Sequence, residues 1–181
     1  MSNQALTGKL VRLTVEDPDV AAGLFTTWNL DSEYLRLLDA DEARLQPRKT
    51  MTEWLEKDGD RSYLFIIRTL GDDRPVGFID LDGIDWGARS AWVGIGIGPR
   101  EDWGKGFGTD AMKTLLRYAF EELNLHRVNL SVFEYNPRAI RSYEKAGFRH
   151  EGRQREALHR AGKRWDMLFM GILKSDWEST S

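Results

Sequence analysis

Apolar residues recur at helical spacing in the first 60 residues, after one short strand. Asp17-Pro18 has the form of an N-cap followed by a proline in the first helical turn, and Thr50 opens a Thr-x-x-Glu capping box. The elements predicted here are a strand at Lys9–Val15, a helix from Pro18 to about Trp28, an irregular helical segment at residues 31–46 and a helix from Thr50 to about Asp58.

The centre of the chain changes to short apolar and β-branched runs separated by turn residues, a pattern that predicts an antiparallel meander. Its strands are predicted at Ser62–Thr69, Val76–Asp85 and Ala91–Gly98, with turns at Gly71–Arg74 and Trp86–Arg89. Three glycines alternate in the last strand, Gly94, Gly96 and Gly98. Glycine inside a strand is typical of a bulge or of a close approach by another backbone or a ligand.

The remainder of the chain mixes both patterns. A glycine-rich loop at Gly104–Gly108 precedes a helix at Thr109–Leu123, and Asn136-Pro137 and Gly147 mark the two ends of a second helix. The strands predicted around them are Val128–Phe133 and a hairpin of Phe148–Leu158 and Arg164–Leu173 that turns at Arg160–Lys163. This order predicts an α+β fold, a mixed and largely antiparallel sheet of about seven strands with helices on both faces.

Composition favours one globular domain over residues 1–181, because 41% of the residues are hydrophobic and 30% are charged. The chain has no cysteine, which excludes disulfides, thiolate catalysis and cysteine-ligated metals, and its three histidines lack the spacing of a zinc site. No metal is therefore expected. No apolar run is long enough to span a membrane and no secretion signal is visible, so we expect a cytoplasmic location and no membrane partner.

The net charge of −3 argues against a nucleic-acid partner, since such proteins usually carry a basic excess. Acidic residues are in excess in residues 1–98, and basic residues are in excess in residues 99–181. Two ligands of opposite charge would explain this asymmetry, and so would chance variation in a solvated surface. Both interpretations stay open at this point.

The stretch Arg100–Thr109 carries the most specific chemistry. Glycines at the alternate positions 104, 106 and 108 allow consecutive backbone N–H groups to point inward, and the helix behind them adds the partial positive charge of its N-terminus. Such a nest predicts a phosphate-binding site. The spacing fits neither a Walker A loop nor the Gly-x-Gly-x-x-Gly of dinucleotide-binding folds, and a loop that only turns the chain is the alternative.

This loop and the segment Asn136–Phe148, one strand later, together resemble the GNAT superfamily of N-acetyltransferases. Gly106 and Gly108 match the glycines of the family pattern Gln/Arg-x-x-Gly-x-Gly/Ala, although Trp103 stands where glutamine or arginine is usual. The resemblance extends over about residues 8–177, the expected structured core. The branch of ribosomal-protein N-terminal acetyltransferases and spermidine acetyltransferases is the most similar, on the segments Leu125–Val128, Tyr143–Phe148 and Met170–Trp177.

The resemblance implies acetyl-CoA as cosubstrate, with its pyrophosphate on the glycine loop and its pantetheine arm in a gap where the fourth and fifth strands splay apart. It also implies that the chain can form a homodimer. The basic residues best placed for phosphates are Arg100, Lys105, Arg138 and Arg141. The residues that the resemblance places at the cofactor are Ile95, Gly96, Ile97, Trp103, Gly104, Lys105, Gly106, Phe107, Gly108, Thr109, Asn136, Arg138 and Arg141.

Tyr143 is the predicted catalytic residue, because the family places a tyrosine here and a phenol with a pKa of ~10 can protonate the departing thiolate. A core aromatic residue is the alternative interpretation, since Tyr143 shares a helical face with Ile140 and Gly147. No general base is evident from the sequence. The candidates are a chain of water molecules or one of the carboxylates Asp80, Asp82, Glu101, Asp102 and Glu134.

The acceptor is expected between the N-terminal helices, the Asp80–Asp85 segment and the hairpin turn at residues 158–165. The first two are acid-rich, which favours a cationic amine, polyamine, aminoglycoside or peptide N-terminus, unless the acidity is only that of a solvated surface. The predicted function is acetyl-CoA-dependent acetylation of a primary amine. A non-catalytic CoA-binding regulatory module is the alternative. A nucleotide-dependent enzyme would need the lysine of a Walker A loop, at its spacing, and acidic metal ligands, which this sequence lacks.

Overall fold

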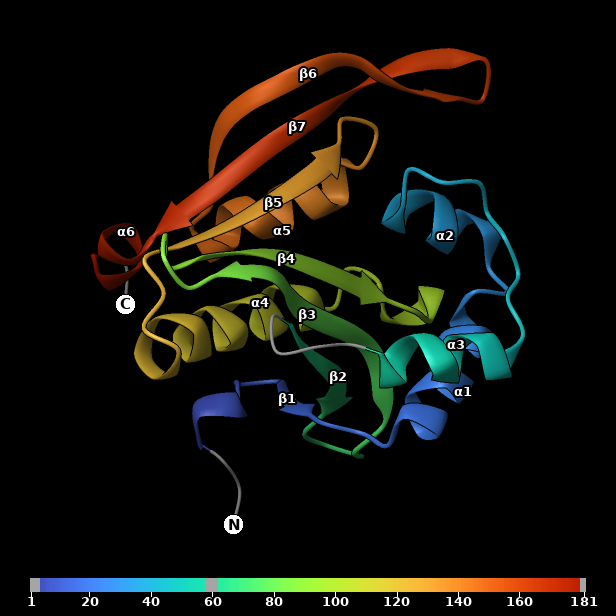
Figure 1. Cartoon of the computed structure of the whole chain (residues 1–181), viewed down its shortest axis with the longest axis horizontal. Helices are drawn as coiled ribbons and strands as arrows, with labels where there is room; N and C mark the ends of the chain where they lie inside the picture. Colours follow the sequence, from blue (N-terminus) through green and yellow to red (C-terminus); the bar gives the residue numbers. More distant parts are fainter. Residues whose placement is uncertain (1–3, 58–61, 180–181) are drawn as a thin grey trace.

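A mixed β-sheet runs through the whole protein, as Figure 1 shows for this computed structural model, which describes residues 4–57 and 62–179. Within these residues the sheet has seven strands in the order β1-β2-β3-β4-β5-β7-β6. The strands are β1 (Val11–Thr14), β2 (Tyr63–Thr69), β3 (Pro75–Asp85), β4 (Ser90–Ile97), β5 (Arg127–Phe133), β6 (Arg149–Arg160) and β7 (Lys163–Leu173). The predicted α+β class, the central meander and the terminal hairpin are confirmed.

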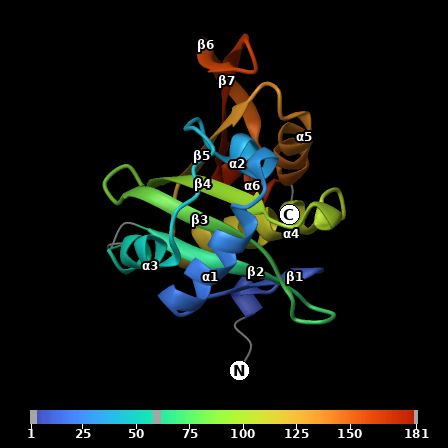
Figure 2. The same cartoon turned by 90° about the vertical axis from the view of Figure 1, so that its right-hand side faces the viewer.

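Helices cover both faces of this sheet. Figure 2 shows α3 (Arg48–Glu56) on one side of β3 and β4, and α4 (Phe107–Arg117) and α5 (Pro137–Ala146) on the other. One apolar cluster lies between the sheet and α4 and α5, and a second lies between the sheet and the N-terminal helices. The remaining helical elements are η1 (Gln4–Leu6), α1 (Pro18–Trp28), α2 (Ser32–Leu38), η2 (Arg100–Asp102), the π-turn η3 (Tyr118–Glu122) and α6 (Lys174–Glu178).

The parallel pair β4 and β5 is joined over only part of its length. Ser90–Trp92 pair with Arg127–Asn129, and no later residues of the two strands pair with each other. Every other neighbouring pair in the sheet is antiparallel. The predicted splay between the fourth and fifth strands is therefore confirmed, and it opens toward the C-terminal ends of both strands.

Local capping signals define α1 and α5 as predicted. The Asp17 carboxylate accepts a hydrogen bond from the Asp19 N–H at the start of α1. The Asn136 side chain accepts one from the Ala139 N–H at 3.2 Å, and Gly147 ends α5 with a φ of 103°. These caps use contacts within three or four residues, which is why the sequence alone reveals them.

Two predicted helix boundaries in the N-terminal region are wrong. The helix α3 begins at Arg48 rather than Thr50, and no side chain caps it, so the capping box does not form. The Arg48 guanidinium instead donates hydrogen bonds of 2.9 and 2.6 Å to the Asp19 carboxylate and so fixes the start of α3 against α1. The predicted end at Asp58 lies outside the described residues. Of residues 31–46, only Ser32–Leu38 are helical.

The helix after the glycine loop also differs from the prediction. It begins two residues early, at Phe107, and its regular part ends at Arg117 in the π-turn, where the Leu123 N–H donates to the Tyr118 carbonyl. The side chains of Ala119 and Phe120 in this turn are fully buried. The burial of these two apolar side chains contributes favourable free energy, which offsets the cost of the irregular backbone.

The Asp110 carboxylate fastens the N-terminal strand to the first turn of α4. It accepts hydrogen bonds from three consecutive backbone N–H groups, those of Lys9 (3.1 Å), Leu10 (2.7 Å) and Val11 (3.0 Å). These contacts link residues about 100 positions apart in the chain. They hold the start of α4, and with it the glycine loop, at a fixed place beside the sheet.

Asp110→Asn tests this connection. The amide places an N–H₂ group where a carboxylate oxygen accepted a backbone hydrogen bond, so at least one of the three N–H groups loses its acceptor. We expect the free energy of unfolding in urea to fall by about 1–3 kcal/mol. The control Glu121→Gln, an exposed carboxylate beyond the far end of α4, should change it by less than about 0.5 kcal/mol. Equal stability of the two variants would contradict the role of Asp110.

Candidate active site

The glycine loop leads into α4 with a left-handed backbone. Gly104 and Gly106 have φ angles of 81° and 90°, which favour glycine, and Gly106 is the N-cap residue of α4. The first N–H groups of the helix have no acceptor within it, and they carry the positive end of its dipole. Gly108, which we expected in the loop, lies inside α4, where a Cβ would be 3.6 Å from Ile97. This backbone agrees with an anion nest, whose phosphate binding stays a prediction of the spacing.

A buried ion pair holds the loop from behind. Asp102 is 1% exposed, and its carboxylate accepts hydrogen bonds of 2.6 and 3.0 Å from Arg74 and one of 3.1 Å from the Lys105 ammonium. The hydrogen bonds from Arg74 are the main reason that the pKa of Asp102 lies below its usual range. Lys105 therefore points at Asp102. Lys105 does not line the pocket described below.

Trp103 joins the splayed strand to α5. Its indole N–H donates a 2.7 Å hydrogen bond to the Ile97 carbonyl, and the Arg138 guanidinium lies 3.8 Å from the ring centroid. Burial lowers the pKa of Arg138 from its usual value. Arg100, in contrast, forms ion pairs with Asp31 and Glu33 and does not line the pocket, contrary to its expected place at the phosphates.

A pocket of about 350 Å³ follows the splay from the start of α4 to α2. Between α4 and α5 it is bridged by the hydroxyl groups of Thr109 and Ser142, which lie 2.7 Å apart. The structure thus brings together residues of β4, the glycine loop, α4 and α5, from Ile95 to Lys145. The predicted site residues that line it are Ile95, Gly96, Ile97, Trp103, Gly104, Gly106, Phe107, Gly108, Thr109, Asn136, Arg138, Arg141 and Tyr143.

Sequence reasoning missed one wall of this pocket. The α2 residues Tyr34, Leu37 and Leu38 line it, and they come from a segment whose only visible signal was an irregular, Leu-rich helical pattern. Lys145 and Ser142 also line it, on the same helix as Tyr143. For these two the helical spacing from Arg138 and Arg141 was a usable signal, because residues three and four apart share one face.

Tyr143 lies on α5 with its side chain both against the core and at the pocket. Its ring packs against Phe148, with 6.2 Å between the ring centroids, and the residue also lines the pocket. Burial raises the pKa of Tyr143 to about 12. The phenol therefore stays protonated at neutral pH and can act as a donor.

The glycines Gly94 and Gly96 of β4, and Gly98 just after its end, have a different cause from the expected approach of a cofactor. A Cβ at Gly94 would lie 2.5 Å from an Asp80 carboxylate oxygen, and one at Gly96 would lie 2.5 Å from the Tyr34 hydroxyl. At Gly98 it would meet the Trp28 ring. Side chains from this chain's own β3, α2 and α1 occupy that face of β4, because alternate residues of a strand point to the same side.

The carboxylates proposed as general bases are dispersed. Of the five, only Asp102 lines the pocket, and its charge is balanced by Arg74 and Lys105. Glu134 pairs with Arg153. Asp80 accepts a 2.9 Å hydrogen bond from the Gly94 N–H, beside the splay. The geometry singles out none of them as a base, which leaves direct attack by a neutral amine as the simplest route.

In the expected acceptor region, one arginine joins the β6–β7 hairpin to the segment at the end of α2. The Arg160 guanidinium, next to the β6–β7 turn, donates hydrogen bonds to the carbonyls of Arg36, Asp39, Ala40 and Asp41 at and beyond the end of α2. Figure 1 shows the resulting overhang of the hairpin above α2. These bonds satisfy carbonyls that have no helical partner where α2 ends at Leu38.

Within the described ranges, His, Asp and Glu side chains form no group of three or more that could hold a metal ion. None of the helices that the structure describes has both the length and the apolar character of a membrane span.

Comparison with known proteins identifies the family. A family model described as "Acetyltransferase (GNAT) domain" matches residues 9–149. The chain belongs to the GNAT acetyltransferases. YjcK of Bacillus subtilis, named as an N-acetyltransferase, is 38% identical over 133 residues, which cover 72% of this chain and 73% of the relative. This GNAT chain is thus an enzyme that transfers an acetyl group from acetyl-CoA to an amine.

Two further matches, one to a sequence and one to a solved structure, have names that refer to polyamines. The spermidine N(1)-acetyltransferase of Vibrio cholerae is 38% identical over 106 residues, which cover 59% of this chain and 61% of the relative. A crystal structure of spermidine N-acetyltransferase from Vibrio cholerae in complex with CoA and spermine has a TM-score of 0.83 and 27% identity. The alignment covers 93% of this GNAT chain and 98% of that one. The seven-stranded fold with its splay is therefore that of a CoA-binding acetyltransferase.

Gly106→Val tests the loop. The left-handed φ of 90° disfavours a β-branched residue, and a Cβ there would lie 3.4 Å from Leu10. We expect acetyl-CoA affinity, measured by calorimetry, to fall by about tenfold or more, since this strain costs roughly 1–2 kcal/mol. Gly152→Val is the matched control, because Gly152 on β6 has open space around it. Unchanged affinity in a folded Gly106→Val protein would remove the loop from the binding site.

Proposed function

We propose that this GNAT acetyltransferase acetylates a cationic amine, with Tyr143 as the general acid that protonates the departing CoA thiolate. The observation that carries this proposal is the position of Tyr143. A protonated phenol lines the same pocket as the start of α4, where backbone N–H groups suit an anion. The pocket thus combines a proton donor for a leaving group with a site that suits phosphates. This combination suits acyl transfer from a CoA thioester.

The residues present fit acetyl-CoA. The N–H groups at the start of α4 suit its pyrophosphate, with Arg138 and Arg141 on α5 as nearby cations. The open edge of β4 beyond Trp92 offers backbone groups to the amide-containing pantetheine arm. Acetyl-CoA supplies the acetyl thioester, and coenzyme A leaves as the thiolate. Asn136, the cap of α5, lines the same pocket and fixes the helix that carries Tyr143.

In the proposed reaction a bond forms between the amine nitrogen and the acetyl carbon while the carbon–sulfur bond breaks. The Tyr143 hydroxyl gives its proton to the sulfur, the amine loses a proton to solvent, and the Tyr143 phenolate regains a proton from solvent. A pKa of about 12 for Tyr143 does not forbid this transfer. Burial penalises a thiolate as it penalises a phenolate, so the pKa of the sulfur rises in the same direction.

The acceptor surface that we propose lies on the β3–β4 face opposite α4. Trp92 is 44% exposed there, and its direct cross-strand partner is Asp82. The Phe169 ring lies 6.4 Å from the Trp92 ring, in an edge-on arrangement. An exposed aromatic face beside carboxylates attracts cations by cation–π and Coulomb interactions. The spermidine and spermine in the names of the relatives agree with such an acceptor.

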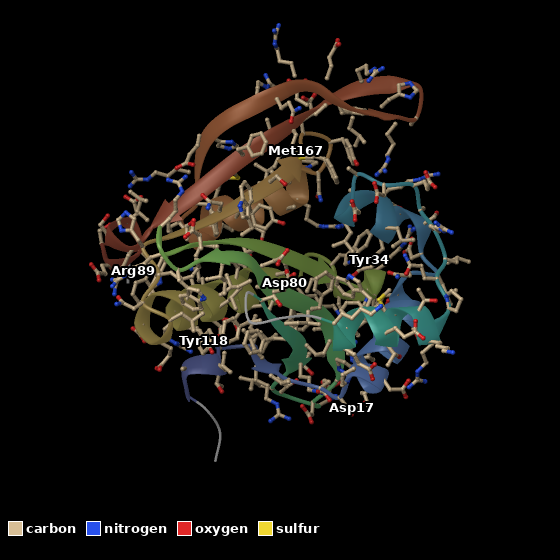
Figure 3. The ribbon with its side chains drawn as sticks, viewed as in Figure 1. Asp17, Tyr34, Asp80, Arg89, Tyr118 and Met167 are labelled. Carbon is tan, nitrogen blue, oxygen red and sulfur yellow. The ribbon has the colours of Figure 1, made fainter. Side chains whose placement is uncertain are left out.

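Part of the acidic excess does not contribute to this surface. Asp31 and Glu33 form ion pairs with Arg100, and the hydrogen bond from Arg100 lowers the pKa of Asp31 to about 2. On the acceptor side, Asp80 (labelled in Figure 3) and Asp82 lie on β3 opposite Gly94 and Trp92. Formation of a homodimer and a cytoplasmic location stay predictions of the sequence.

Tyr143→Phe keeps the ring and removes only the hydroxyl. We expect kcat to fall by roughly 10²–10⁴, because the leaving thiolate loses its proton donor, while affinity for acetyl-CoA changes little. Steady-state kinetics and calorimetry measure the two effects. Tyr118→Phe, which removes a half-buried phenol that does not line the pocket, is the control. A loss of less than about threefold would show that the thiolate leaves without help from Tyr143.

The charge of the acceptor is tested with a panel of polyamines, aminoglycosides, amino acids and peptides. We expect the best acceptor to be cationic and its KM to rise between 0.05 and about 0.5 M salt, as screening over ~10 Å or less weakens the attraction. Asp82→Asn should raise this KM, and Glu121→Gln should not. If the best acceptor is neutral or anionic, the acidic surface has no part in recognition.

The same assay gives a pH dependence. Attack requires a neutral amine, whose reference pKa is ~8 for an α-amino group and ~10 for an alkyl amine, so kcat/KM should rise from pH 6 to pH 9. Because the pKa of Tyr143 is raised to about 12, its acidic form persists over this range and adds no descending limb. A decline of kcat/KM below pH 9 would contradict Tyr143 as the acid.

A further inference from the structure

A second tyrosine at the pocket has a hydroxyl without a partner. Tyr34 is 3% exposed, and among the described residues its hydroxyl is a buried polar atom with no hydrogen bond. Native proteins nearly always satisfy such groups, because an unmade hydrogen bond in a low-dielectric interior costs free energy. A buried donor that stays unpaired therefore indicates a partner that arrives with a ligand.

The position of Tyr34 is well defined. Asp31 caps α2 and accepts hydrogen bonds from the N–H groups of Glu33 and Tyr34 at 2.9 and 3.3 Å. The Tyr34 hydroxyl then lies over Gly96, at 2.5 Å from the place where a Cβ would be. Trp92 is the last residue of β4 that pairs with β5, and Gly96 lies beyond it on the unpaired part of the strand, so the hydroxyl lies at the splay.

Tyr34 and Tyr143 reach the pocket from opposite faces of the sheet. Tyr34 belongs to the apolar cluster of the N-terminal helices, and Tyr143 packs against the cluster of α4 and α5. Both line the one pocket. Figure 3 shows Tyr34 beneath α2, well away from Tyr118 on the other side of the molecule.

The chemistry around Tyr34 favours a carbonyl oxygen as the partner. Its neighbours at this end of the pocket are Leu37 and Leu38, which offer no hydrogen bond from their side chains. Burial raises the pKa of Tyr34 above its usual value, so the phenol is neutral and can donate. With phosphates at the start of α4, the arm of acetyl-CoA runs along β4 toward this end, and it carries one thioester carbonyl and two amide carbonyls.

We propose that the Tyr34 hydroxyl donates a hydrogen bond to a carbonyl oxygen of the acetyl-pantetheine arm. The proposal rests on acetyl-CoA as cosubstrate, but not on Tyr143 as the acid. At an amide carbonyl, Tyr34 positions the arm. At the thioester carbonyl, it also stabilises the negative charge that develops on that oxygen during attack.

Tyr34→Phe tests the proposal with two ligands that differ only in the acetyl group. Calorimetry with acetyl-CoA should show an affinity loss of roughly 3- to 10-fold relative to the unmodified chain. If CoA binding is unchanged, the thioester carbonyl is the partner, and kcat should fall as well. If the affinity for CoA falls by the same factor as the affinity for acetyl-CoA, an amide carbonyl is the partner. Unchanged affinity for both ligands overturns the proposal.

Thermal unfolding without ligand separates this role from a structural one. Since the hydroxyl has no partner in the described residues, Tyr34→Phe should have the same Tm as the unmodified chain or a higher one. A Tm lower by several degrees means that the hydroxyl has a structural partner, which also overturns the proposal. Tyr118→Phe is the matched control and should bind both ligands normally. If the Tyr34→Phe results contradict this proposal, the kinetic effect expected for Tyr143→Phe is unchanged. The two proposals can therefore be tested independently.

Discussion

The structure depends on one incomplete strand pairing. The strands β4 and β5 pair at Ser90–Trp92 and then separate, although both continue for several residues. A parallel ladder that stops midway leaves backbone donors and acceptors without strand partners, and in a folded protein such groups need other partners. The Ile97 carbonyl accepts a hydrogen bond from the Trp103 indole, and a ligand with amide character can fill the rest of the gap. The pocket that follows this gap is the place where the CoA arm can do so.

Fixed charges on two sides keep the anion-binding loop in place next to this gap. Asp110 fastens the start of α4 to the N-terminal strand, and Asp102 joins the loop to Arg74 and Lys105. Both carboxylates are hydrogen-bonded to donors of the protein itself. Their negative charge is therefore directed away from a phosphate bound at the loop. A loop held in this way is already ordered before the ligand binds. The loss of conformational entropy on binding is therefore smaller.

The two faces of the sheet divide the chemistry between them. The face with α4 and α5 carries the anion nest, the cations of α5 and Tyr143, whereas the face with α1 and α2 carries Tyr34 and the exposed Trp92 beside carboxylates. The missing side chains of Gly94 and Gly96 allow Asp80 and Tyr34 to reach the β4 backbone from the second face. Opposite charges on the two sides suit an anionic cosubstrate and a cationic acceptor that meet at the splay.

The sequence by itself determined the strand order along the chain, the caps at Asp17, Asn136 and Gly147, and the loop-to-helix site with Tyr143. These signals depend on contacts within a few residues or on a family motif. Only the tertiary structure decided that Arg160 binds the carbonyls at the end of α2 and that Tyr34 lines the pocket, because Arg160 and Gly96 lie more than 60 positions away from their partners. Pairs so distant leave no periodic trace in one sequence, since the side chains meet only after the sheet has formed.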